Sequence, residues 1–256
     1  MSNLFWLTDA QMARLQPFFP KNHGKPRVDD RRVLIGIIFI NRNGLRWCDA
    51  PREYGRAKTL YNRWKRWGDK GIFARILEGL ASEAAVPKTV MIDATYLKAH
   101  RTATSLRSKK GGADDQRDRL IGRTKGGMNT KLHAVTDAEG RPIRFYITAG
   151  QVSDYTGAAA LLGSLPMADW LLADRGYDAD WFRDALKDKG IKPCIPGRKS
   201  RGKPIKHDKR RHKRRNRIEI MFGRLKDWRR VATRYDRCPK VFLSAVALAA
   251  TVMFWL

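Results

Sequence analysis

Glu219 is an acidic residue inside the most basic stretch of the chain. The surrounding run, His212–Lys226, draws most of its polar residues from Lys and Arg. Such cations suit a phosphate backbone, whereas a carboxylate among them weakens phosphate binding unless it does something that the cations cannot do. Holding a divalent metal ion is one such task. Glu219 is therefore a candidate metal ligand.

Two further carboxylates each follow an apolar run. Asp93 comes after Val90–Ile92, and Asp174 comes after Trp170–Ala173. If these runs are neighbouring strands, both carboxylates reach one edge of a sheet, although an Asp in this position is also typical of a turn or helix cap. Phosphodiester cleavage with two metal ions requires clustered acidic side chains, and oxygen ligands favour Mg²⁺ or Mn²⁺. The three carboxylates together indicate a metal-dependent enzyme that acts on nucleic acid.

Helix geometry places three basic residues beside Glu219. At about 100° per residue, Arg215, Lys226 and His212 all fall within about 40° of it. An apolar set occupies the adjoining face, so the stripe would lie at the edge of a core: Ile218, Met221, Leu225 and Trp228. An ordinary ion pair between Arg215 and Glu219 would produce the same alignment.

The composition favours a polyanionic partner. The chain has 53 Lys and Arg against 25 Asp and Glu, a net charge of +28 and a pI near 10.6. Eighteen of these cations lie between Pro196 and Arg237. Nucleic acid is the first candidate partner and a membrane surface the second. We expect no membrane association, because the apolar run Val241–Leu256 is short, contains Ser244 and Thr251, and suits a core helix.

The three cysteines form no C-x-x-C pair, so neither a disulfide framework nor a zinc module is expected. This pattern is typical of the reducing cytoplasm, and with nucleic acid as partner the expected location is cytoplasmic and nucleoid-associated.

The first part of the chain, 1–85, is predicted to be a small all-α DNA-binding domain. Thr8 or Asp9 would cap one helix, and Asp29 or Asp30 would cap another through Val33–Ile40. Two short helices, Pro51–Tyr54 and Thr59–Trp67, are spaced like a helix-turn-helix. The second would present Lys58, Asn62, Arg63, Lys65 and Arg66 outward, and Leu60, Tyr61, Trp64 and Trp67 mostly inward. A helical domain with a solvated basic face is the alternative.

The second part, 86–256, is predicted to be an α/β domain with a mixed sheet flanked by helices. Arg101–Gly127 is predicted to be a mobile surface loop, and the charged linker Gly197–Lys209 to be flexible or ordered by its partner. The expected strands are Lys88–Leu97, Asn129–Thr136, Pro142–Ala149, Trp170–Ala173 and Ile191–Ile195, and the expected helices between them are Tyr155–Leu165 and Asp180–Lys189.

Several motifs resemble the bacterial insertion-sequence transposases of the DDE class, in particular the insertion sequence five group, over nearly the whole chain. The family's third motif is Y-x2-R-x3-E-x6-K; Arg215, Glu219 and Lys226 fit it, whereas His212 stands in the tyrosine position. The matching segments are Leu7–Gln11, Asp30–Arg32, Pro51–Gly55, Tyr61–Trp64, Ile92–Thr95, Gly126–Lys131, Ala173–Asp178 and Arg215–Glu219.

The resemblance implies a ribonuclease H-like fold in which Asp93, Asp174 and Glu219 hold two Mg²⁺ (or Mn²⁺) ions. It also implies that a metal-activated water cuts the end of the element and that the released 3′-hydroxyl attacks target DNA. Arg215 and Lys226 would contact DNA near the cleaved end. His212, and Lys131 within Gly126–Lys131, are further candidates for DNA contacts.

The expected partners are double-stranded DNA, both terminal inverted repeats and target, and a second copy of the chain in a synaptic homodimer. Three alternatives stay open. They are another ribonuclease H-fold DNA nuclease, a catalytically inactive DNA-binding protein derived from a transposase, and a basic structural RNA-binding protein that would need no acidic triad.

Overall fold

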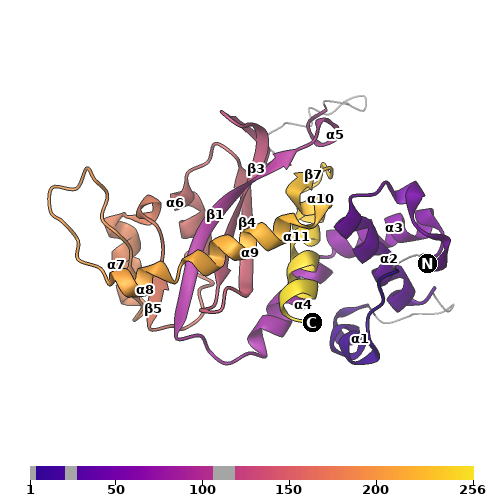
Figure 1. The fold of residues 1–256 in the computed structure, drawn as a ribbon, viewed down its shortest axis with the longest axis horizontal. Coiled ribbons are helices and arrows are strands. Elements are labelled where there is room, and N and C mark those ends of the chain that lie inside the picture. The colour runs from indigo at the N-terminus through magenta and orange to yellow at the C-terminus, as the bar shows by residue number, and fades with distance from the viewer. Residues whose placement is uncertain (1–3, 21–27, 106–118) are drawn as a thin grey trace.

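A computed structural model describes residues 4–20, 28–105 and 119–256 (Figure 1). Part of the predicted mobile loop Arg101–Gly127 therefore lies outside the described residues. Within its described portion, the segment is not all loop. A short helix, α5 (Arg101–Thr104), follows the first strand, and β2 (Gly122–Thr124) adds to the sheet. Neither element is long enough to leave a periodic pattern in the sequence.

The N-terminal part is helical, as predicted. Thr8 accepts a hydrogen bond from the backbone of Gln11 and Asp29 accepts one from Arg31, so each caps the helix that follows it. The elements are α1 (Asp9–Leu15), η1 (Gln16–Phe18), α2 (Asp30–Asn43), η2 (Trp47–Asp49), η3 (Arg52–Tyr54), α3 (Ala57–Asp69) and α4 (Ile72–Ser82).

The helix-turn-helix-like segment differs from the prediction in two ways. Its first helix is only the single 3₁₀ turn η3, and α3 packs mainly against α2, η2 and the C-terminal helix α11 (Pro239–Phe254). Arg63, expected on the outer face, is buried because it pairs with Asp30 and stacks over the Trp67 ring. Tyr61, expected inward, is exposed beside Trp47. A guanidinium that keeps an ion pair and an aromatic contact can take an inward position that a pattern of charges would exclude.

The sheet is mixed and is built around one long strand, β1 (Thr89–Ala99). β3 (Gly127–Thr136) pairs with it in antiparallel orientation, and β4 (Pro142–Ala149) pairs with β3 in the same way. On the other side, β5 (Trp170–Leu172) runs parallel to β1, and β6 (Lys192–Cys194) runs parallel to β5. β1, β3 and β4 thus form an antiparallel set, and β5 and β6 extend the sheet on the other side of β1 as parallel strands. This is the ribonuclease H-like arrangement that the resemblance implied.

Helices cover both faces of this sheet. Alternate residues of β1 point to opposite faces. Val90 and Ile92 pack with α6 (Asp154–Leu162) and α7 (Asp180–Asp188), whereas Met91 faces the opposite cluster. The chain then continues through α8 (Lys209–Lys213), α9 (Asn216–Lys226), α10 (Arg229–Ala232), β7 (Thr233–Arg234) and α11 (Pro239–Phe254).

α11 joins the two parts of the molecule. It packs against α2, α3 and α4 of the helical part and against β4 and α9 of the sheet part. Its buried apolar residues belong to one hydrophobic cluster that extends from Leu7 to Trp255. The prediction of a core helix here is confirmed, and no helix in the described part of the chain has the length and apolar character needed to span a membrane.

Candidate active site

Asp93 on β1 and Asp174 just beyond the end of β5 are related by the register of these two neighbouring parallel strands. In the β1–β5 pair, Met91 is the partner of Leu172. Asp93 and Asp174 each lie two residues further along their strands, so the alternation of side chains directs both toward the same face. This is also the face of β1 on which Met91 packs toward the cluster containing α9 and α11. The structure therefore brings together the two carboxylates that the sequence placed on separate strands.

A tight turn fixes Asp174 just beyond the end of β5. Its Oδ1 accepts a hydrogen bond of 2.8 Å from the backbone N–H of Gly176 and so caps the 3₁₀ turn η5 (Arg175–Tyr177). Gly176 permits this approach, because a Cβ at that position would lie 2.8 Å from the same oxygen. The capping role that the sequence offered as an alternative is thus present, and it orients the carboxylate.

Arg215 links Asp93 to Glu219. Glu219 lies in the first turn of α9, which packs on β1 (Figure 1). The Arg215 guanidinium donates to Asp93 Oδ2 at 2.7 Å and, with its other terminal nitrogen, to Glu219 Oε1. The ion pair expected from spacing alone is therefore present, and the same side chain also reaches the central strand. Its two bonds bring Glu219 to the edge where Asp93 lies.

The other two basic residues predicted beside Glu219, Lys226 and His212, contact different strands. Lys226 Nζ donates to Thr95 Oγ1 on β1 at 2.8 Å. His212 Nε2 instead donates to the carbonyl oxygen of Ala173 at 3.0 Å, at the end of β5. The helix is interrupted between α8 and α9, where the bonds become i to i+3, so residues on either side no longer follow one α-helical stripe. His212 here holds the strand end that carries Asp174.

Burial and neighbouring charges destabilise the ionised form of Asp93. Burial is the largest effect on its pKa and raises it, the Arg215 cation and the backbone N–H of Ala94 lower it, and the negative charges of Asp174 and Glu219 raise it, so that the resulting pKa is about 6. Burial also lowers the pKa of Lys226. Asp93 is therefore a buried carboxylate whose ionised form is disfavoured by burial and by the charges of Asp174 and Glu219, and such a group favours a bound cation.

The donor set fits a hard divalent cation. Three carboxylates supply only oxygen ligands, which Mg²⁺ and Mn²⁺ prefer. Among the described residues, no three acidic, His or Cys side chains converge into a formed metal cluster. Instead, Arg215 contacts Asp93 and Glu219, so a metal ion and this guanidinium would compete for the same oxygens.

The other residues predicted to bind DNA lie in different environments. On α3, Asn62, Lys65 and Arg66 are exposed, whereas Arg63 is buried. Lys131 is also buried, and its ammonium group donates to Val152 O at 2.6 Å and to Asp154 at 3.0 Å. A DNA contact by Lys131 or Arg63 would require these internal contacts to break.

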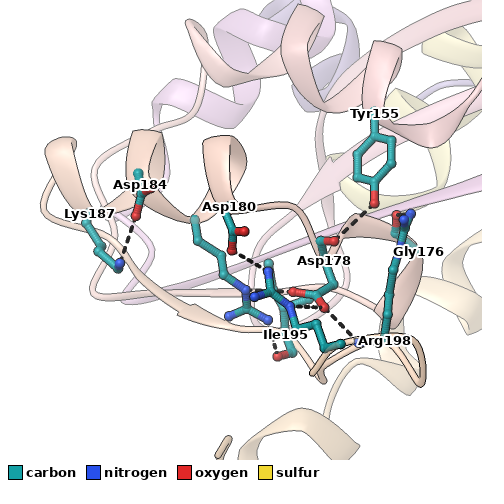
Figure 2. A network of polar contacts seen from close by, with 10 residues as sticks. Tyr155, Gly176, Asp178, Asp180, Asp184, Lys187, Ile195 and Arg198 are labelled. Carbon is teal, nitrogen blue, oxygen red and sulfur yellow. Dashed lines mark hydrogen bonds and ion pairs between the residues drawn. The ribbon is translucent and has the colours of Figure 1, made fainter. Parts of the chain in front are cut away.

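Two contributors were missed by the sequence reasoning. Thr95 accepts the hydrogen bond from Lys226, and it belongs to the segment Ile92–Thr95, which the sequence singled out without a role for its last residue. Asp178 anchors a network of arginines beside the Asp174 turn (Figure 2). It belongs to the segment Ala173–Asp178, which the sequence singled out without a role for its last residue.

Comparisons with known proteins identify the family of the chain. The family model described as "Transposase DDE domain" matches residues 84–254, and that described as "Putative transposase of IS4/5 family" matches residues 7–77.

Among individual relatives, a putative transposase for insertion sequence element IS6501 from Brucella ovis is 38% identical over 131 residues, which are 50% of this chain and 99% of the relative. A putative transposase for insertion sequence element IS402 from Burkholderia cepacia is 28% identical over 204 residues, which are 69% of this chain and 94% of the relative.

Solved structures resemble the chain only distantly. The crystal structure of a pre-cleavage Mos1 transpososome shares 12% identity, with coverage of 91% of this chain and 82% of that one, at a TM-score of 0.28. No equivalence of individual residues follows from similarity at this level.

Proposed function

Since the chain belongs to the family of transposase DDE domains, we propose that Asp93, Asp174 and Glu219 catalyse cleavage and transfer of DNA strands by this transposase. The observation that carries this assignment is the Arg215 guanidinium, which contacts both Asp93 on β1 and Glu219 on α9. In addition, Asp93 and Asp174 each lie two residues beyond the paired residues Met91 and Leu172 of the parallel strands β1 and β5.

We propose that the three carboxylates hold two Mg²⁺ or Mn²⁺ ions. When bound, such ions would activate the attacking oxygen and stabilise the leaving one. Asp93 would be favoured as a ligand, because burial raises its pKa and a bound cation would offset that cost to its ionised form. The turn capped by Asp174 and the first turn of α9 would fix the other two carboxylates.

Basic residues beside the carboxylates would bind the DNA. Arg215 and Lys226 lie at the face of β1 and would contact phosphates near the cleaved end. On α3, the exposed Asn62, Lys65 and Arg66 would contact the terminal inverted repeats. We further propose that residues 1–85 form the DNA-reading unit and 86–256 the catalytic one, that two copies act together on the two ends, and that the protein works at the nucleoid in the cytoplasm.

Single substitutions test the assignment. Asp93→Ala, Asp174→Ala and Glu219→Ala should each abolish Mg²⁺-dependent cleavage of a duplex that carries the inverted repeat, while binding of that duplex is retained. Each should also weaken the binding of Mn²⁺, measured by titration calorimetry. Asp227→Ala, which removes an exposed carboxylate at the end of the same helix, is the matched control.

The result separates the alternatives. Cleavage that survives in all three variants would overturn the catalytic assignment. If the wild-type chain binds the duplex but never cuts it, the protein is an inactive descendant of a transposase. His212, which stands in the tyrosine position of the family motif, would then be the first residue to substitute. A nuclease of another kind would cut DNA without joining the released 3′-hydroxyl to a target.

A further inference from the structure

Asp178 is a fully buried carboxylate that joins three segments of the chain (Figure 2). It accepts hydrogen bonds from Arg183 Nε on α7 at 2.8 Å, from the backbone N–H of Arg198 at 2.7 Å and from Arg201 Nε at 2.8 Å. Burial alone would raise its pKa, but the bonds from Arg201, Arg198 and Arg183 outweigh burial and lower it to about 2. Asp178 is therefore ionised, and both of its carboxylate oxygens accept hydrogen bonds that hold these segments together.

The segment that Asp178 anchors is the connection 196–208 between β6 and α8, which we call the basic arm. Arg201 also pairs with Asp180, and Arg198 lies 4.7 Å from the centre of the Tyr155 ring. At its far end, the carbonyl of Asp208 accepts a bond from Cys194 Sγ at 3.5 Å. The sequence left open whether this linker is flexible or ordered by a partner. In the structure it is fastened at both ends by contacts within the chain.

The arm presents cations that its own fold does not use. The side chains of Lys199, Lys203 and Lys206 are exposed, and within the described residues no hydrogen bond or ion pair engages their ammonium groups. The arm also touches the turn that carries Asp174, because Arg198 donates to Gly176 O at 3.3 Å. Its cations are thus fastened beside a turn that holds one of the three site carboxylates.

We propose that the basic arm is a preformed surface that binds the phosphate backbone of duplex DNA beside the Asp174 turn, and that Asp178 is its positioning residue. The inference rests on the proposed function for its substrate. A flexible arm would lose conformational freedom on binding DNA, whereas an arm already fixed by Asp178 would lose little, so its lysines would bind more tightly. Asp178 would favour DNA binding by fixing the conformation of the arm and not by its charge, because its negative charge repels phosphates.

The charge of Asp178 and its anchoring role have opposite effects on DNA affinity, so a substitution can distinguish them. Asp178→Asn removes one negative charge, so charge alone predicts tighter binding of DNA, whereas loss of the anchor predicts weaker binding. Asp184→Asn removes the same charge on the nearby helix α7, where Asp184 forms an exposed pair with Lys187 (Figure 2). Binding of a fluorescein-labelled duplex of mixed sequence by the full chain, with EDTA present to prevent cleavage, should be weakened about tenfold by D178N and not by D184N.

Two further measurements separate positioning from charge and from misfolding. D178N should leave the slope of log K against log salt near the wild-type value, whereas Lys199→Gln, Lys203→Gln and Lys206→Gln combined should reduce that slope by roughly 0.9 for each phosphate that is no longer neutralised. Arg201→Lys keeps the charge but loses the planar fork that reaches Asp178 and Asp180, so it should also weaken binding. R201K decides the case if D178N does not fold.

The outcomes are distinct. A wild-type chain that does not bind duplex DNA would refute the proposed function. A wild-type chain that binds, with folded D178N or R201K binding as tightly as D184N, would overturn the positioning role. An unchanged salt slope in the triple lysine variant would overturn the phosphate-binding role of the arm.

Discussion

At the scale of single residues, the position of the Asp174 carboxylate depends on the absence of a side chain at Gly176. Gly176→Ala would put a Cβ 2.8 Å from Asp174 Oδ1, so the carboxylate must move away from the position where it caps η5. We expect cleavage to fall about 100-fold, since displacements of about 1 Å in catalytic groups have effects of this order. DNA binding should be unchanged.

Gly163→Ala is the control for this substitution. Gly163 ends α6 in a right-handed helical conformation, and a Cβ there would have no neighbour within 4 Å. Rates of strand cleavage under single-turnover conditions compare the two variants. Equal rates for Gly176→Ala and wild type would show that the Asp174 turn does not position a catalytic group.

Arg215 permits a second prediction at this scale. Its guanidinium contacts the same Asp93 and Glu219 oxygens that a metal ion would use. Arg215→Gln should therefore leave Mn²⁺ binding intact or strengthen it by up to about tenfold, a change of roughly 1.4 kcal/mol, while cleavage falls because no guanidinium remains to bind the DNA. Calorimetric titration of Mn²⁺ checks this. Weaker Mn²⁺ binding in R215Q than in the exposed helix control Arg224→Gln would contradict the competition.

At the scale of elements, the sequence predicted those with long, regular patterns. The strands β1, β3 and β4 agree with the predicted runs to within two residues at each end, because alternating and apolar side chains extend over eight or more positions. The parallel pairing of β1 with β5 was not predictable in register. It depends on contacts between residues some 80 positions apart, and only this register makes Asp93 and Asp174 equivalent.

What the sequence could not show depends on contacts between elements. The interruption between α8 and α9 has no Pro or Gly to signal it, and the tightened turn there sends His212 to Ala173 rather than toward Glu219. The inward position of Arg63 depends on Asp30, which belongs to another helix. Charge and periodicity alone cannot identify such a partner.

The corrected orientation of α3 gives a prediction at the scale of elements. Arg63→Ala removes a partner of Asp30 in a site where both side chains are largely buried, so we expect the free energy of unfolding to fall by about 3 kcal/mol. Lys65→Ala, on the exposed face, should change stability by less than about 0.5 kcal/mol and weaken DNA binding.

Urea unfolding and duplex binding, measured on both variants, test this difference. If Arg63→Ala were as stable as wild type but bound DNA poorly, the inward orientation of Arg63 would be wrong.

At the scale of the whole molecule, the two parts of the chain share one core. α11 packs against the helices of the N-terminal part as well as against β4 and α9. Neither part can open without exposing apolar surface of this helix, so we expect them to unfold together. Native-state hydrogen exchange should give α2 and β1 the same opening free energy and the same urea dependence. A lower opening free energy for α2 alone would indicate two independently folding units.

The stability of the whole molecule should depend on pH through His133, a buried residue of β3 that pairs across the sheet with Ala94. Burial lowers the pKa of His133 from 6.5 to about 4, with Asp154 opposing the change and Lys131 adding to it. Its Nε2 lies 2.9 Å from Thr148 Oγ1. The unfolded chain therefore takes up a proton near pH 6.5, whereas the native protein does so only near pH 4.

The sign of the effect follows from this order. As the pH falls through the window from 6.5 to about 4, the unfolded state binds the proton first, and the protein loses stability. The contribution is complete above this window, and the loss across it is on the order of 3 kcal/mol. His133→Gln cannot titrate, so the difference in unfolding free energy between wild type and this variant should shift in favour of the variant as the pH falls. Urea unfolding of both proteins across the window measures that difference; parallel curves would mean that His133 carries its proton equally in the folded and unfolded chains.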